Sequence, residues 1–166
     1  MKRNSAIIIF FTVFVLVLGI VLAGILSNGQ PIRYNHEKHI QQADLECLDC
    51  HKNVETSARA SIPNIETCSE CHDDPEDENE EIRKVASYVE EGKRIPWKQV
   101  NVVPDYAFFS HRRHVVLAEI TCETCHGNVS SMATPFSEPY QEINMDWCMD
   151  CHEERKASSD CYACHR

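Results

Sequence analysis

The chain has 166 residues and a formal net charge of −10 at pH 7. This acidic balance argues against nucleic acid or an anionic membrane surface as the main partner of the protein. Beyond its first 26 residues, the chain is poor in large aliphatic residues, so we expect a thin hydrophobic core.

An uncharged apolar run from Ala6 to Leu26 follows the basic residues Lys2 and Arg3. About 20 apolar residues are enough to cross a bilayer as one helix. A cleaved signal peptide is the alternative, but its apolar region would be about 7–15 residues long. Because no cysteine lies near the end of the run, a lipoprotein anchor is excluded. The pattern therefore favours a retained transmembrane helix.

The basic pair before this run predicts the orientation of the chain. Under the positive-inside rule, Lys2 and Arg3 lie on the cytoplasmic side. We therefore expect a membrane anchor over residues 1–27 and a domain over residues 28–166. That domain lies on the periplasmic, extracytoplasmic side of the cell membrane of a prokaryote.

The ten cysteines fall into five Cys-x-x-Cys-His motifs, the attachment signature of c-type haem. Two cysteines three residues apart lie on one turn and can bond the two vinyl groups of one porphyrin, and the next histidine can bind the iron. Disulfides and zinc are alternative roles for paired cysteines, but neither requires that histidine. We therefore predict five c-type haems. The attachment residues are Cys47, Cys50, Cys68, Cys71, Cys122, Cys125, Cys148, Cys151, Cys161 and Cys164, and the proximal ligands are His51, His72, His126, His152 and His165.

The other four histidines belong to an internal repeat. The pairs are His36-Glu-Lys-His39, preceded by Tyr34, and His111-Arg-Arg-His114, preceded by Phe109. Each pair is followed by seven residues and then by a haem motif. Histidines three residues apart share a helical face, so each pair can present two imidazoles to two different haems. We predict His36, His39, His111 and His114 as distal ligands, and a surface histidine is the alternative.

Four distal histidines leave a fifth haem without a histidine partner. Met132, Met145 and Met149 are candidates by chemistry, and an open iron is the alternative. Met149 lies inside a haem motif and Met132 lies in a Ser-rich loop, whereas Met145 is free to face a neighbouring haem. We therefore expect Met145 to be the fifth distal ligand, although such a methionine more often has a packing role.

The haem motifs divide the domain into two modules. Residues 34–72 hold two haems, residues 108–166 hold three, and residues 73–107 connect them. The last two motifs are separated by only eight residues, from Glu153 to Asp160, so their haems must lie close together.

The connector carries its own structural signals. It opens with an acidic run over residues 73–81, which indicates a solvated loop. Apolar residues then recur at helical spacing up to Gly92, which predicts an amphipathic helix over residues 80–91. Prolines bound an extended segment over residues 95–104. The predicted fold is therefore mainly α with much irregular structure, and haem ligation specifies it more than a core does.

The repeated His-x-x-His before Cys-x-x-Cys-His resembles the small multihaem cytochromes of the c3 and c7 types. The chain is more closely similar to the pentahaem subunit of alternative complex III, a quinol-oxidising membrane complex. That resemblance implies c7-like modules behind one N-terminal helix, Met145 as a non-histidine ligand, and two partners: an integral quinol-binding subunit and an iron–sulfur/molybdopterin-type subunit. A related complex with another oxidoreductase partner is the alternative. The matching segments are Pro31 to His36, Ile62-Pro63, Ile95 to Asp105, Phe109 to His114, Cys125 to Gly127, Met145 to Cys148 and Ser159 to Cys161.

These features predict an electron-transfer subunit of a quinol/quinone oxidoreductase complex, with no catalysis of its own. One alternative is an anchored multihaem reductase in which an open haem reduces a small molecule such as nitrite. Another is a stand-alone quinol dehydrogenase.

Overall fold

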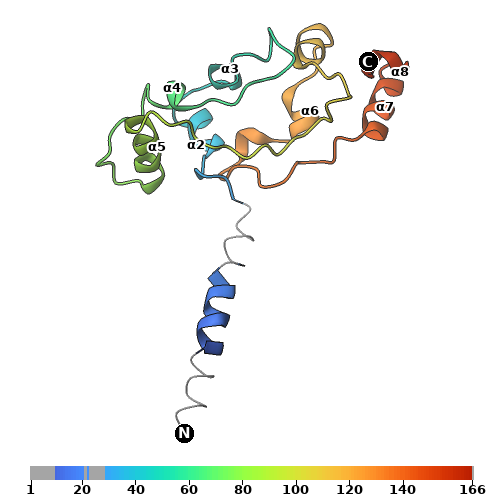
Figure 1. Ribbon diagram of the computed structural model, residues 1–166. Coiled ribbons are helices and arrows are strands. Elements are labelled where there is room, and N and C mark those ends of the chain that lie inside the picture. The colour runs from blue at the N-terminus through green and yellow to red at the C-terminus, as the bar shows by residue number, and fades with distance from the viewer. Residues whose placement is uncertain (1–9, 21, 23–28, 166) are drawn as a thin grey trace.

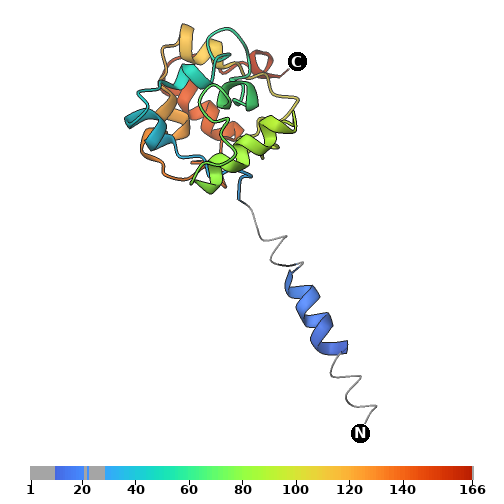
Figure 2. The same cartoon turned by 90° about the vertical axis from the view of Figure 1, so that its left-hand side faces the viewer.

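The computed structural model of the protein describes residues 10–20, 22 and 29–165. Residues 10–20 form a helix that lies apart from the other described residues, as two views at 90° to each other show (Figures 1 and 2). Its apolar side chains are exposed. Among the described residues, no helix is long and apolar enough to cross a membrane. The predicted anchor over residues 1–27 lies partly outside the described residues.

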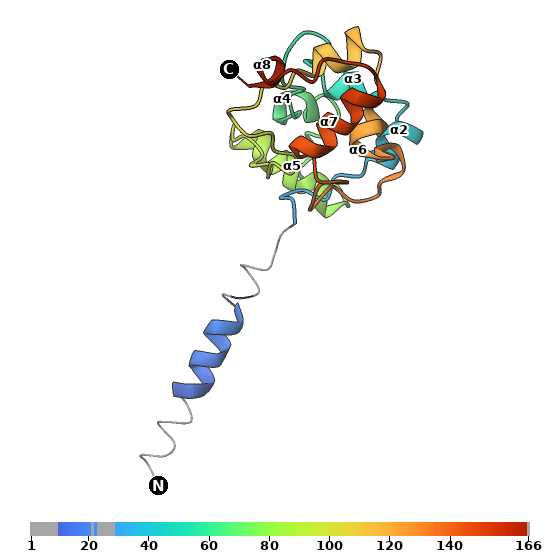
Figure 3. The same ribbon diagram turned by 90° about the vertical axis from the view of Figure 1, so that its right-hand side faces the viewer.

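Short helices joined by irregular segments form the rest of the described chain, as predicted. In Figure 3, the longer helix α7 crosses the middle of the part formed by residues 29–165. The helices are α2 (His36–Gln41), α3 (Cys47–Cys50), α4 (Ile65–Cys68), α5 (Glu80–Glu90), the π-helix η1 (Arg113–Leu117), α6 (Cys122–His126), the 3-10 helix η2 (Val129–Ser131), α7 (Met145–Glu154) and α8 (Cys161–Cys164).

Amide and carboxylate side chains begin most of these helices. A side-chain oxygen at the N-cap accepts a hydrogen bond from a backbone N–H that has no partner within the first turn. At α4, α7 and α8, this local signal places the start of the helix just before or at the first cysteine of a haem motif. The capping residues are Asn35 at α2, Asn64 at α4, Asn79 at α5, Asn144 at α7 and Asp160 at α8.

The predicted amphipathic helix of the connector is confirmed as α5, which is capped at Glu91 and followed by Gly92 at a φ of +61°. A left-handed residue just after a helix is a common stop, and glycine adopts this conformation without strain. The acidic residues before α5 are mostly exposed, which confirms the predicted solvated loop.

A small hydrophobic cluster lies between α4, α5 and the segment after α5. Ile32, Val85 and Ile95 are buried there, and the side chains of Cys68 and Trp97 pack against them. Within the described residues, the buried hydrophobic side chains are few. They are Ile32, Val54, Val85, Ala86, Ile95 and Ile120. The prediction of a thin core is therefore confirmed for this part of the chain.

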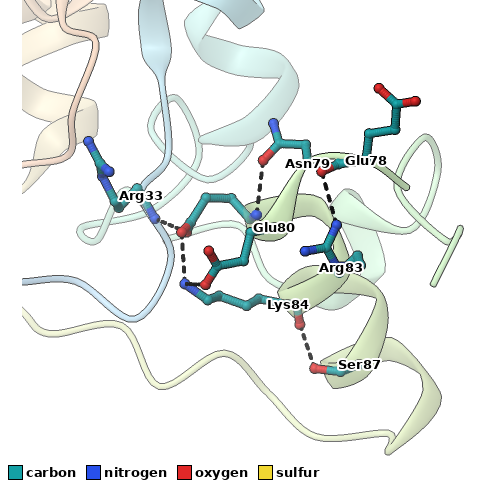
Figure 4. Close-up of polar contacts among 8 residues, drawn as sticks. Arg33, Glu78, Asn79, Glu80, Arg83, Lys84 and Ser87 are labelled. Carbon is teal, nitrogen blue, oxygen red and sulfur yellow. Dashed lines mark hydrogen bonds and ion pairs between the residues drawn. The ribbon is translucent and has the colours of Figure 1, made fainter. Parts of the chain in front are cut away.

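Polar contacts connect Arg33, near the start of residues 29–165, to α5 (Figure 4). The Glu81 carboxylate accepts hydrogen bonds from the Arg33 N–H at 2.6 Å and the Lys84 ammonium at 2.8 Å, and Lys84 also pairs with Glu80 at 3.1 Å. Partial burial raises the pKa of Glu81, but these hydrogen bonds outweigh it and hold the pKa below its usual value.

Candidate haem-binding sites

Each predicted haem motif lies on a helix or at its end. We number the motifs as sites 1 to 5 in chain order. Helices α3 and α8 each span the two cysteines of one motif, and α6 and α7 each contain a complete motif. In site 2, α4 ends at Cys68 and turns continue to Cys71. At every site, the two thiols therefore belong to one helix or to a helix and the turns that follow it.

The ten thiols are free and none is buried in the described chain. Cys47, Cys71, Cys122 and Cys161 are exposed. Unmodified cysteine is among the most often buried residue types, so exposure at four motifs is unusual for a packing role. Exposed thiols on a helical turn are instead accessible for covalent attachment.

The two histidine pairs have the same ring geometry, which explains the aromatic residue of the repeat. Tyr34 meets His36 edge-on at 4.7 Å between ring centroids and stacks on His39 at 4.4 Å. Phe109 likewise meets His111 edge-on at 4.8 Å and stacks on His114 at 4.6 Å. Each aromatic ring therefore holds two imidazoles at a fixed angle to each other.

The backbone after each pair is also repeated. The N–H of Leu45 donates to the His39 carbonyl at 3.2 Å, and the N–H of Ile120 donates to the His114 carbonyl at 3.0 Å. Five residues after the second histidine, both copies have a non-glycine residue in the left-handed region, with φ of 55° and 52°. This tight turn returns the chain to the following haem motif. One difference is that the second copy continues into a π-helix where the first has α2.

Three of the four predicted distal histidines each lie next to one predicted proximal histidine. The ring centroids are 5.9 Å apart for His39 and His72 and 6.4 Å apart for His111 and His126. A third pair joins sites far apart in sequence, His114 and His152, at 6.2 Å.

The fourth predicted distal histidine, His36, lies near His51. Burial lowers the pKa of His36 to about 4, and the neighbouring imidazoles of His51 and His39 add to the effect. In the second module, His111 thus faces the first motif and His114 faces the second, and in the first module His39 likewise faces the second motif.

These separations fit one iron between each pair of rings. Two imidazoles that bind a metal ion from opposite sides, with nitrogen–metal distances of about 2.0–2.1 Å, place their centroids about 6 Å apart. Rotation about the nitrogen–metal bonds does not change this distance. The differing angles between the rings, 76°, 9° and 35°, are therefore all compatible with it.

Backbone carbonyls orient most of the imidazoles. A carbonyl oxygen can only accept, so a ring Nδ1 beside it carries the proton and Nε2 keeps the lone pair that binds a metal. These carbonyls carry no side-chain signal, and the sequence could not reveal them. The Nδ1–oxygen pairs are His39 with Asn35 at 2.7 Å, His51 with Ser61 at 2.8 Å, His111 with Ala58 at 3.0 Å, His114 with Ser110 at 2.9 Å, His152 with Ser158 at 2.6 Å and His165 with Tyr106 at 3.1 Å.

Site 5 has different surroundings. The His165 ring stacks on the Tyr106 ring at 5.9 Å between centroids, a contact that the sequence pattern did not indicate. Met145 is the first residue of α7, one turn before Cys148, and its side chain is 65% exposed. The Cys148 thiol lies close to Cys164: burial raises its pKa, and the Cys164 thiol raises it further. Residues three apart share a helical face, so Met145 lies on the face of α7 near site 5.

Two comparisons with known proteins agree with this geometry. Residues 32–89 and 107–166 match the family described as cytochrome c7 and related cytochrome c. The chain is also 31% identical, over 166 aligned positions, to the multihaem cytochrome c subunit of menaquinone reductase from Nitratidesulfovibrio vulgaris. That similarity covers 84% of this chain and 78% of its relative.

Proposed function

This chain belongs to the family of cytochrome c7 and related c-type cytochromes, and on that premise we propose that it binds five haems and relays electrons between other proteins. Haem c, when attached, supplies one-electron oxidation and reduction. The five Cys-x-x-Cys pairs hold the porphyrins, and the histidine after each pair is the proximal ligand. His36, His39, His111 and His114 are the distal ligands.

The separation of about 6 Å between paired histidine rings carries this proposal. Two histidines on opposite sides of an iron fill both axial positions, so a substrate cannot bind there. Histidine ligation at both positions also gives a lower potential than a methionine ligand does. Such sites suit electron transfer and not substrate chemistry.

Met145 completes the fifth site in this proposal. It shares a helical face with Cys148, whose thiol lies close to the Cys164 thiol of site 5. A thioether is a known axial ligand of c-type haem. A fifth iron with both axial positions filled leaves the chain without a catalytic site of its own.

We further propose that the chain is a subunit of a membrane quinone oxidoreductase complex. Its relative from Nitratidesulfovibrio vulgaris is named as the multihaem cytochrome c subunit of menaquinone reductase, which supports this assignment. An alternative complex III type of assembly, with an integral quinol-binding subunit and an iron–sulfur/molybdopterin-type subunit, is one form of such a complex. The apolar N-terminal residues 1–27 then anchor the cytochrome domain on the periplasmic side.

Carbon monoxide binding to the reduced, haem-loaded protein tests the relay function. Five filled irons should bind carbon monoxide slowly or not at all, whereas the Met145→Ala variant should bind one per chain. Rapid binding of one carbon monoxide by the unaltered protein would instead favour the reductase with an open haem. A matched variant, Met149→Leu, should behave as the unaltered protein.

Purification of the native complex from membranes tests the partners. An integral quinol-binding protein should co-purify with the chain. Recovery of the cytochrome alone, with quinol oxidation activity, would instead support a stand-alone quinol dehydrogenase.

A further inference from the structure

The arrangement of the five sites in space differs from their order in the sequence. In Figure 1, the motif helices follow one another from left to right as α4, α3, α6 and then α7 with α8. Helix α4, which belongs to site 2, thus lies at one end, and α3, which belongs to site 1, lies between α4 and α6. Contacts between neighbouring sites support this order.

Within each module, one turn of backbone joins two sites. In the first module, His39 faces His72 of site 2, and His36 lies near His51 of site 1. Tyr34 contacts both distal rings, and it also lies close to Cys50 of site 1. Sites 1 and 2 are therefore neighbours. The same geometry around Phe109 makes sites 3 and 4 neighbours.

The loop after site 1 joins the two modules. The His51 Nδ1 donates to the Ser61 carbonyl of this loop at 2.8 Å. Three residues earlier, the Ala58 carbonyl accepts from both the backbone N–H and the Nδ1 of His111, each at 3.0 Å. One short loop thus orients the proximal ligand of site 1 and the distal ligand of site 3.

One thiol of site 1 and one thiol of site 3 also lie near each other at this junction. Burial raises the pKa of the Cys122 thiol of site 3, and the nearby Cys47 thiol of site 1 raises it further. Sites 1 and 3 therefore approach each other at their attachment residues and through the loop that orients His51 and His111.

Site 3 follows site 2 in the sequence, but the connector, and not site 3, packs against site 2. Helix α5 packs on α4, and Cys68 packs against the cluster of Val85 and Ile95. The chain thus folds back over site 2 before it reaches the second module. At the other end, α7 ends at Glu154 and α8 begins at Cys161, so only six residues join the helices of sites 4 and 5. The nearby Cys164 thiol of site 5 also adds to burial in raising the pKa of the Cys148 thiol of site 4.

We propose that the haem sites form one series in the spatial order 2–1–3–4–5, joined between modules by sites 1 and 3. This inference rests on the proposed haem binding. Sites 2 and 5 are then the two ends of the series, where redox partners exchange electrons. Sites 2 and 3, consecutive in sequence, are separated by site 1.

Iron positions from anomalous diffraction on crystals of the haem-loaded protein test this order. The iron nearest to that of site 2 should belong to site 1, and the iron of site 3 should lie nearer to site 1 than to site 2. A shorter distance between sites 2 and 3, or a site 5 iron nearer to any iron other than that of site 4, would overturn the series. Fewer than five irons would instead contradict the proposed haem binding.

Matched ligand variants test the order in solution. Methionine in place of a distal histidine raises the potential of its haem, so that haem is reduced first. Reduction adds one negative charge to that haem, which lowers the potentials of the haems around it. Only the nearest haems are affected strongly, because the interaction weakens with distance. In haem-resolved redox titrations, reduction of the altered haem should shift one neighbour in His39→Met (site 2) and two neighbours in His36→Met (site 1). Equal numbers of shifted neighbours would overturn the order. If either variant loses a haem, the iron positions decide.

Discussion

Asn64 connects site 2 to the connector, and its removal should destabilise the protein more than the loss of an ordinary helix cap. The side chain is 6% exposed and Ile95 is 3% exposed. The Asn64 Oδ1 accepts from the N–H of Ile65 at 3.0 Å and of Ile95 at 2.8 Å, and its Nδ2 donates to the Ile95 carbonyl at 3.1 Å. One amide therefore caps α4 and pairs with both backbone groups of a buried residue.

The expected magnitude follows from these three bonds. Loss of an N-cap costs about 0.5–2 kcal/mol. A buried backbone group that loses its only partner costs about 1–3 kcal/mol. The Ile95 N–H is such a group, whereas the Ile95 carbonyl keeps the hydrogen bond that it accepts from the Trp97 N–H at 2.9 Å. Because water can enter the space left by a truncated side chain, we expect Asn64→Ala to lower the free energy of unfolding by about 2–4 kcal/mol.

Urea denaturation of the haem-loaded protein, followed by circular dichroism, measures this loss. The matched control is Asn144→Ala, which removes an exposed cap with one hydrogen bond to the Trp147 N–H at 3.0 Å. That variant should lose about 0.5–1 kcal/mol. If the two variants differ by less than about 0.5 kcal/mol, the pairing of Asn64 with Ile95 does not stabilise the fold as argued.

Three further predictions concern ligands and charge. His39→Ala should leave all five haems attached but open one iron, so that the reduced protein binds one carbon monoxide per chain; binding to none would contradict the pairing with His72. Tyr34→Phe should keep the low-spin electron paramagnetic resonance spectrum, because the stacked ring remains. Tyr34→Leu should broaden the signals of two haems. Equal spectra for the two variants would exclude an orienting role for the ring of residue 34. The pKa of Glu81 is lowered in the folded protein, so the ionised carboxylate stabilises the fold. This stabilisation is fully present above the unfolded pKa of about 4.3, and it is lost as the pH falls through the folded pKa. Glu81→Gln should therefore flatten the fall in stability below pH 5 in urea titrations, and an unchanged pH profile would contradict this contribution.

Local patterns made much of the fold predictable. Helix α5 was predicted over residues 80–91 and is observed at Glu80–Glu90, because its apolar spacing, capping and glycine stop all act within one short segment. The repeat of aromatic residue, two histidines and haem motif was visible for the same reason. The anchor and the haem ligand roles stay predictions that the proposed experiments test.

Contacts between distant segments could not be predicted in this way. The pairing of His114 with His152 and the Ala58 carbonyl beside His111 both join residues far apart in the chain. Tyr106 beside His165 was also missed, since an aromatic residue in an irregular segment has no distinguishing pattern.

The sequence by itself determined which residues can hold haem, because attachment needs two cysteines and a histidine within one turn of the chain. It also showed that the other four histidines come in two pairs from a repeated segment. Only the tertiary structure placed His39, His111 and His114 next to particular motif histidines and set one loop against both His51 and His111. The physical reason is that these contacts depend on how the backbone folds back on itself, through carbonyl groups that every residue carries alike.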